Sequence, residues 1–153
     1  MADTDLHERL FAFESDFGGD LRCIPMAVRR KLDLCGRKLR LQTWLGWGEE
    51  RRRALLHWPD DGAGLAALVE ALAEETTPLP PAHGEPWQGR GPLPPPVAAA
   101  SAELGLAVDE GAWAGLDELQ RFALLKLSLP GHGRHNLARA LAEFGLADQG
   151  PIR

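Results

Sequence analysis

The sequence has no tyrosine and few β-branched residues, with only 4 valines and 2 isoleucines. Because strands favour β-branched and aromatic side chains, this shortage argues against a large sheet. The two cysteines, Cys23 and Cys35, are too few for a disulfide scaffold. With no export signal, we expect them to be reduced thiols in the cytoplasm. No apolar run approaches the roughly 18 residues that a membrane span needs, so we expect no membrane partner.

Leucine and alanine are abundant, at 26 and 22 of the 153 residues, and both favour helices. Hydrophobic residues make up 44% of the chain and charged residues 25%, which is typical of a globular protein. A chain of this length can bury a sizeable core and is short for two domains. The composition therefore predicts an all-α fold, a single compact helical domain over residues 1–153 with about six helices.

The spacing of the apolar residues places these helices, and several of their ends carry a suitable residue. Asp61, Asp117 and Asn136 can cap helix starts with a side-chain oxygen, and Gly36 suits the residue after a helix. Residues 118–129 are apolar on most faces, which is typical of a helix at the centre of a domain. The expected helices lie at 25–35, 49–58, 62–74, 97–104, 118–129 and from 137 onward.

Two segments are expected to be irregular. Residues 1–20 form an N-terminal arm, which we expect to be extended and packed through Phe11, Phe13 and Phe17. Residues 76–96 hold eight of the twelve prolines and form a long Pro-rich loop, or strap, that passes through Trp87. The strap is either a structural connection pinned by Trp87 or a segment that docks a partner.

An internal repeat relates residues 44–56 to residues 113–125, with seven of thirteen positions identical. The shared pattern contains a tryptophan, a turn glycine, a glutamate with an arginine three residues later, and a final pair of leucines. It predicts two helix-turn-helix-like units in which the tryptophan ends a short helix and the leucines of the next helix enter the core. The glutamate and the arginine are expected to pair on the helix surface.

The net charge of −5 conceals an uneven distribution, because residues 21–53 carry ten Lys or Arg against three acidic residues. Such a basic segment can bind an anion or a nucleic acid. It can equally pack on the protein's own acidic part or form a solvated helix face. The acidity of the whole chain weighs against DNA binding, so nucleic acid is not an expected partner.

The sequence offers few groups for metal or catalytic chemistry. The weak candidates for metal ligands are Cys23, Cys35, His132 and His135, but eleven residues separate the cysteines and two separate the histidines. These spacings differ from those of structural zinc sites. No phosphate-binding glycine motif, nucleophile elbow or His-Glu-x-x-His motif is present. We therefore expect no metal site, no cofactor and no enzymatic activity.

Several longer strings can be compared with known families. They are Phe11-Ala-Phe-Glu-Ser-Asp-Phe17, Leu21-Arg-Cys-Ile-Pro-Met-Ala-Val-Arg29, Lys31-Leu-Asp-Leu-Cys-Gly36, Lys38-Leu39, Leu119-Gln-Arg-Phe-Ala-Leu-Leu-Lys-Leu127, Pro130-Gly-His132, Asn136 and Glu143-Phe-Gly-Leu146. Together these strings span nearly the whole chain and resemble the nitrate reductase-associated protein family. The sequence departs from the family pattern at Arg30, at Arg37, around residues 57–59 and at residues 137–139, positions that bear on partner surfaces and leave the core pattern intact.

The resemblance implies a small non-catalytic accessory protein, encoded near assimilatory nitrate reductase and molybdenum-cofactor genes. It implies nitrate reductase or its maturation machinery as the partner, with molybdenum-cofactor insertion as a step that the protein would support. The alternative is an anion- or nucleic-acid-binding regulatory protein that uses the basic residues 21–53. The polar residues of the matched strings that we expect to be exposed and to bind the partner are Arg22, Arg29, Lys31, Asp33, Arg121, Lys126 and His132.

Overall fold

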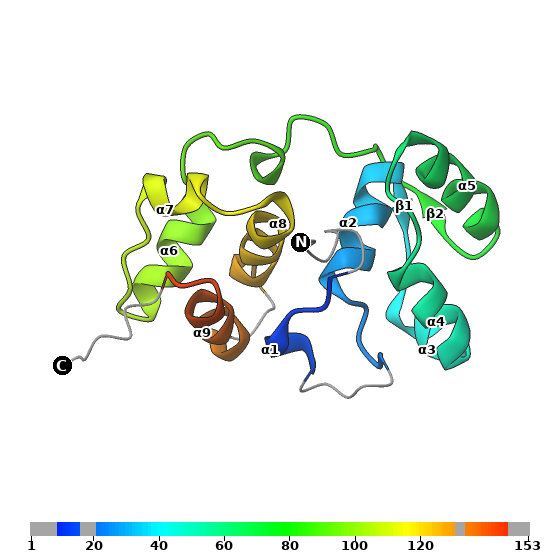
Figure 1. The fold of residues 1–153 in the computed structure, drawn as a ribbon, viewed down its shortest axis with the longest axis horizontal. Helices are drawn as coiled ribbons and strands as arrows, with labels where there is room; N and C mark the ends of the chain where they lie inside the picture. The colour runs from blue at the N-terminus through cyan, green and yellow to red at the C-terminus, as the bar shows by residue number, and fades with distance from the viewer. Residues whose placement is uncertain (1–8, 16–20, 131–133, 147–153) are drawn as a thin grey trace, which may run out of the picture. The chain divides into compact units, whose positions relative to one another are not determined.

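The structure is a computed structural model and describes residues 9–15, 21–130 and 134–146. Helices form most of this part of the chain, and its two strands are two residues long each (Figure 1). The all-α prediction is therefore confirmed. Besides the six helices placed by apolar spacing, the described residues form α3 (Leu41–Gly46) and α7 (Glu110–Ala114), the short helices that the repeat predicts, and one further short helix, α1 (Ala12–Ser15). None of the described helices is long and apolar enough to cross a membrane.

The chain divides into two compact units, the first of which spans Met1–His83. Its main helix, α2 (Met26–Cys35), packs against α4 (Glu49–Leu56) and α5 (Gly62–Leu72). The strands β1 (Arg37–Lys38) and β2 (Thr77–Pro78) pair antiparallel, with Lys38 opposite Thr77. This short pairing fastens the end of α2 to the segment that follows α5.

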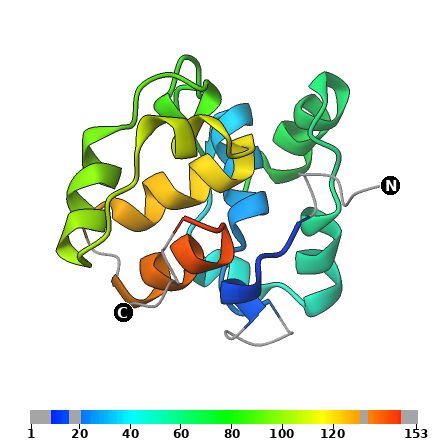
Figure 2. The same ribbon diagram turned by 60° about the vertical axis from the view of Figure 1, so that its left-hand side comes forward.

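The second compact unit spans Gly84–Arg153 and is built around α8 (Glu118–Ser128). This helix packs against α6 (Pro95–Glu103), α9 (Arg134–Glu143) and the 3-10 helix η2 (Pro86–Gln88), as Figure 2 shows from a second direction. Its apolar side chains are buried on several sides, which confirms the central position expected for residues 118–129. That both units belong to one domain over residues 1–153 stays a prediction.

The Pro-rich strap is held by its tryptophan, which is the first of the two alternatives. Trp87 is only 2% exposed, and its ring meets that of Phe122 edge-on with the two centroids 4.9 Å apart. The backbone carbonyl of Trp87 accepts a hydrogen bond from Arg121 Nε at 3.1 Å. An aromatic contact and a hydrogen bond therefore fasten the strap to α8.

The N-terminal arm differs from the expectation of an extended segment, because residues 12–15 form α1. Phe11 and Phe13 are buried as expected, with stacked rings whose centroids are 5.5 Å apart, whereas Phe17 lies outside the described residues. The reason for the helical turn is Glu14, whose carboxylate accepts hydrogen bonds from the backbone N–H of Phe11 at 3.1 Å and of Met26 at 2.6 Å. The same carboxylate thus holds α1 and satisfies the start of α2, where a negative charge is favourable.

Three of the expected helix ends are confirmed and one is wrong. Asp61 accepts from the backbone N–H of Gly64, Asp117 forms a reciprocal capping box with Gln120, and Gly36 follows α2 in the left-handed conformation with φ of 78°. Asn136 was expected to cap the last helix, but α9 already begins at Arg134. Three polar residues in succession at this point gave no apolar periodicity from which to find the first turn.

The two helix-turn-helix units of the repeat are confirmed, and one lies in each compact unit. They are α3 with α4 and α7 with α8, and in both the tryptophan of the short helix, Trp44 or Trp113, is fully buried. Gly48 and Asp117 occupy the cap positions of the second helices. The first of the predicted surface pairs differs, however. Glu49 pairs with Arg53, one helical turn away, at 2.7 Å rather than with Arg52.

The structure extends this repeat to four helices in each unit at the same offset of 69 residues. The residues before α2 and α6 are Pro25 and Pro94, and the glycines that follow these helices, Gly36 and Gly105, have φ of 78° and 76°. Between residues 25–72 and 94–141, 15 of 48 positions are identical, including pairs of leucines buried in both α5 and α9. The two units therefore share one order of helices, caps and core positions, although α8 packs along α9 while α4 and α5 make little contact.

Candidate interaction surface

Lys31 was expected to be exposed and to bind a partner, but its side chain is fully buried. Its Nζ donates hydrogen bonds to the backbone carbonyls of Leu55 at 2.7 Å and Leu56 at 2.6 Å, at the last residues of α4. These carbonyls have no partner within their own helix, and a positive charge at a helix C-terminus is favourable. The expected exposure is therefore wrong, and Lys31 joins α2 to the end of α4.

Arg121 is buried as well, contrary to the same expectation, and is 4% exposed. Its guanidinium donates to the carbonyls of Trp87 and Leu116, which join α8 to the strap and to the turn before the helix. Burial lowers the pKa of Arg121, and the nearby charge of Arg90 lowers it further. An arginine remains charged at neutral pH even so, so the side chain acts as a fixed cationic donor inside the second unit.

The other expected partner-binding residues are more accessible. Arg22 is exposed, and Arg29, which donates from Nε to the Ile24 carbonyl at 3.0 Å, is partly exposed. Asp33 is partly exposed on α2, and Lys126 on α8 places its ammonium 5.3 Å from the centre of the Phe122 ring. His132 lies outside the described residues. A role of these residues in binding stays a prediction.

The weak metal candidates do not form a cluster among the residues that the structure describes. Cys23 is exposed, whereas Cys35 is partly buried and lies 3.6 Å from the Leu32 carbonyl, to which its thiol can donate. Burial raises the pKa of the Cys35 thiol, which disfavours the thiolate that a metal would need. His135 is exposed at the start of α9. Within these residues no group of three or more potential ligands is positioned to hold a metal ion.

Much of the basic segment, residues 21–53, is engaged within the first unit. Arg30 is buried and forms an ion pair with Asp60 at 2.8 Å. Arg37 donates to Thr76 Oγ1 at 2.9 Å and to the carbonyls of Ala73 and Thr76. These contacts favour the interpretation that the segment packs on acidic and polar groups of the protein itself, because its cations join α2 and β1 to residues 60–76.

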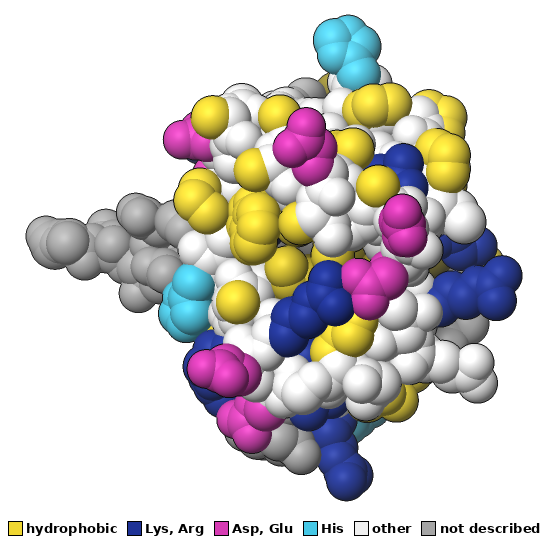
Figure 3. Space-filling model, turned by 90° about the vertical axis from the view of Figure 1, so that its right-hand side faces the viewer, with side chains coloured by type: hydrophobic (Ala, Val, Ile, Leu, Met, Phe, Trp, Pro, Cys, Tyr) yellow, Lys and Arg dark blue, Asp and Glu magenta, His cyan; other side chains and the backbone are white. Residues whose placement is uncertain are grey.

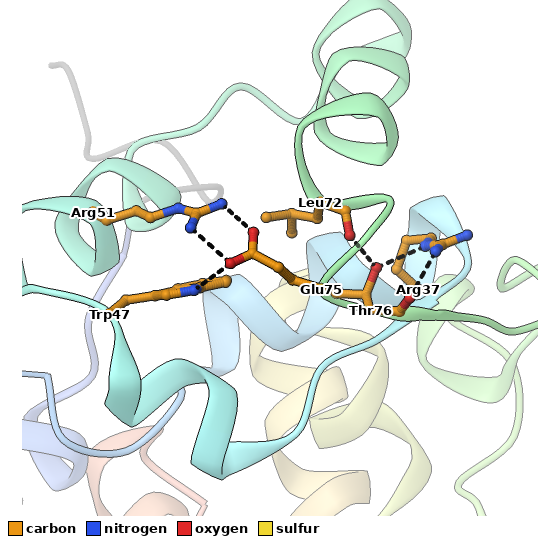
Figure 4. A network of polar contacts seen from close by, with 6 residues as sticks. All are labelled: Arg37, Trp47, Arg51, Leu72, Glu75 and Thr76. Atoms are coloured by element: carbon orange, nitrogen blue, oxygen red, sulfur yellow. Dashed lines mark hydrogen bonds and ion pairs between the residues drawn. The ribbon is translucent and has the colours of Figure 1, made fainter.

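A second part of the segment forms an exposed network with Glu75 (Figure 4). Arg51 donates two hydrogen bonds to the Glu75 carboxylate, at 2.6 and 3.0 Å, and Trp47 Nε1 donates a third at 2.9 Å. The Arg51 guanidinium also stacks on the Trp47 ring, 4.2 Å from its centre. The hydrogen bonds from Arg51, and then that from Trp47, lower the pKa of Glu75. The network joins the turn before α4 to the residues after α5.

One surface of the first unit combines exposed leucines with exposed cations, and we call Lys38, Arg40, Leu41 and Leu45 the α3 surface. Leu41 and Leu45 are 48% and 45% exposed, and both cations are exposed. Figure 3 views the chain from the side of α3, α4 and α5, where apolar side chains are exposed among basic and acidic ones. Sequence reasoning missed this surface, because Leu41, Trp44 and Leu45 follow the i, i+3, i+4 spacing of a single apolar helix face, which predicts burial of all three side chains.

Comparison with protein families gives one match. The family described as conserved nitrate reductase-associated protein matches residues 10–144, a range that includes most of both compact units. Comparisons with curated proteins and with solved structures found no match. The strings that carry the sequence resemblance lie almost entirely within the matched range.

Proposed function

Because the chain belongs to the nitrate reductase-associated protein family, we propose that it is a non-catalytic accessory protein that binds assimilatory nitrate reductase in the cytoplasm. The family match over residues 10–144 carries this proposal, since the family description names an association with that enzyme. The structure is compatible with this proposal. Lys31 and Arg121 are buried and hydrogen-bonded within the fold, whereas the apolar and basic α3 surface remains exposed and available for a partner.

The step that we propose for the accessory protein is maturation of the enzyme. In this proposal the protein binds nitrate reductase before the molybdenum cofactor is inserted and releases it afterwards. The gene neighbourhood that the family resemblance implies supports this assignment. A protein that acts in this way needs a binding surface and no catalytic group of its own.

Co-purification and a deletion strain test the proposal together. We expect the tagged full chain to retain nitrate reductase from cells that lack the cofactor and to retain less from cells with mature enzyme. We also expect the deletion to lower both nitrate reductase activity and the molybdenum content per enzyme. Unchanged activity with normal molybdenum content would refute the accessory role. Low activity with normal molybdenum content would refute insertion as the step and preserve the association.

The alternative, a regulator that binds anions or nucleic acid through residues 21–53, has less support from the contacts. Arg30, Arg37 and Arg51 already bind groups of the first unit, which leaves fewer cations to neutralise phosphates. Titration of the full chain with duplex DNA and with pyrophosphate at low ionic strength would distinguish the two functions. Saturable binding that weakens as salt is added would favour the alternative.

A further inference from the structure

Helix α3 is anchored by a buried tryptophan, and the two leucines beside it on the same helix face remain partly exposed. Trp44 is fully buried and donates from Nε1 to the Leu21 carbonyl at 2.7 Å, which fixes the orientation of the helix. Leu41 and Leu45, which lie one helical turn apart, are the most exposed large hydrophobic side chains of the described residues. The helix therefore holds two neighbouring leucines in contact with water.

Two cations accompany these leucines. Arg40 is the residue before the first turn of α3, and Lys38 lies two residues earlier in β1. Both side chains are exposed, and neither forms an ion pair or hydrogen bond with the residues that the structure describes. They differ in this from Arg30 and Arg51, whose charges are paired with carboxylates. The α3 surface thus presents apolar area next to positive charge that the described part of the protein leaves uncompensated.

The second compact unit shows that the fold does not need these side chains. At the offset of 69 residues, Leu41 and Leu45 correspond to Glu110 and Ala114, and Arg40 corresponds to Asp109. Helix α7 nevertheless forms at the equivalent position in the chain and contains the buried Trp113. The leucines and cations of the α3 surface are therefore additions to a shared scaffold, whereas the tryptophan is part of the scaffold.

We propose that the α3 surface docks an acidic amphipathic helix of nitrate reductase. Apolar side chains of that helix would cover Leu41 and Leu45, and its carboxylates would meet Lys38 and Arg40. Charge complementarity selects this occupant, because a basic or purely polar helix would leave the leucines exposed or place like charges together. The inference rests on the proposed function and adds to it the chemistry of the contact.

A peptide experiment tests the chemistry without the enzyme. The probe is a fluorescent helical peptide of about 18 residues with leucines along one face and glutamates elsewhere, and a scrambled peptide of the same composition is the control. We expect the full chain to bind the amphipathic peptide, and Leu41→Glu with Leu45→Ala to weaken binding by about tenfold or more. Arg40→Asp should weaken it too and reduce its dependence on salt.

Two controls keep this result interpretable. The substitutions copy residues that α7 already carries, and circular dichroism verifies that each variant stays folded. Leu79→Ala removes another exposed leucine, which is 38% exposed and lies outside α3, and should leave peptide binding unchanged. Any one of three results would overturn the inference. They are no binding of the amphipathic peptide at low salt, equal binding of the scrambled peptide, and equal binding of the amphipathic peptide to the α3 variant.

The same variants, used as bait for nitrate reductase, separate the two proposals. If the wild-type chain retains the enzyme and the α3 variant does not, both proposals are supported. If both chains retain it equally, the accessory function stands and the α3 inference fails. If the wild-type chain does not retain the enzyme, the proposed function fails. The assignment of the docked acidic helix to nitrate reductase then fails as well, and the peptide experiment alone decides whether the α3 surface binds such a helix. A wild-type dimer that the α3 substitutions convert to a monomer would instead assign the surface to a second copy.

Discussion

Trp44 and Trp113, 69 residues apart, occupy equivalent positions in the two compact units, and both are fully buried. Their indole nitrogens differ in one respect. Trp44 Nε1 donates to the Leu21 carbonyl, whereas Trp113 Nε1 has no partner among the described residues. The chain therefore contains its own controlled comparison of a buried tryptophan with and without its hydrogen bond.

Replacing each tryptophan by phenylalanine should show this difference. Both changes remove similar volume from a core, but only Trp44→Phe leaves a buried carbonyl without its donor. We expect Trp44→Phe to lower the free energy of unfolding by about 1–2 kcal/mol more than Trp113→Phe does. Urea unfolding followed by circular dichroism measures the two values. Equal losses would mean that the hydrogen bond of Trp44 contributes nothing net.

Lys31→Met tests whether the buried lysine serves the fold. Methionine fills similar space but cannot donate to the carbonyls of Leu55 and Leu56, so we expect a loss of about 2–3 kcal/mol in the free energy of unfolding. Lys38→Met, on the exposed surface, should change it by less than about 0.5 kcal/mol. If Lys31→Met unfolds like the wild type, the two hydrogen bonds of the lysine contribute nothing net to the stability of the fold.

Two glycines of α5 should respond oppositely to alanine. A Cβ at Gly64 would lie 2.4 Å from the Pro59 carbonyl oxygen, so the backbone must shift, and we expect a loss of about 2 kcal/mol or more. At Gly62 nothing lies within 4 Å, and alanine should stabilise by about 0.5 kcal/mol because it restricts the unfolded chain. Thermal unfolding of the two single variants measures both signs, and a neutral Gly64→Ala would contradict the close approach of Pro59.

The Glu75 network predicts a pH dependence in the acid range. The pKa of this carboxyl lies below its ordinary value of 4.5, so its contribution to stability is present above that value and is lost as the pH falls through the lower, folded value. We expect Glu75→Gln to make unfolding less dependent on pH between about pH 5 and 3. The effect is modest, since the pair is exposed to solvent. Glu74→Gln, on the neighbouring residue, should keep the wild-type slope, and a wild-type slope in Glu75→Gln would refute the coupling.

The sequence correctly predicted the features that depend on residues close together in the chain. The cap of Asp117 reaches a backbone N–H only three residues away, and the apolar residues of α8 are consecutive or nearly so, so the start of this helix and its burial were both predicted correctly. The candidate site was predicted less well. Lys31 and Arg121 are charged residues in strings that resemble a family, which suggested exposure. Lys31 donates to Leu55, which lies 24 residues away along the chain. Arg121 donates to Trp87, 34 residues away, as well as to the nearby Leu116. No local pattern reports the two distant contacts.

The sequence by itself determined that the chain is helical, because leucine and alanine replace the residues that strands need, and it revealed thirteen residues of the repeat through their identities. Only the tertiary structure decided that the repeat covers four helices in each unit. Equivalent cap and core positions of the two units can be filled by different residues, so sequence identity does not reveal them. Arg40 before α3 and Asp109 before α7 are an example. It also decided which charges are surface charges. A cation is buried or exposed according to the carbonyls and carboxylates that folding brings to it. For Lys31 the acceptor carbonyls lie far along the chain, whereas the described residues offer no acceptor to the side chain of Arg40, which is exposed.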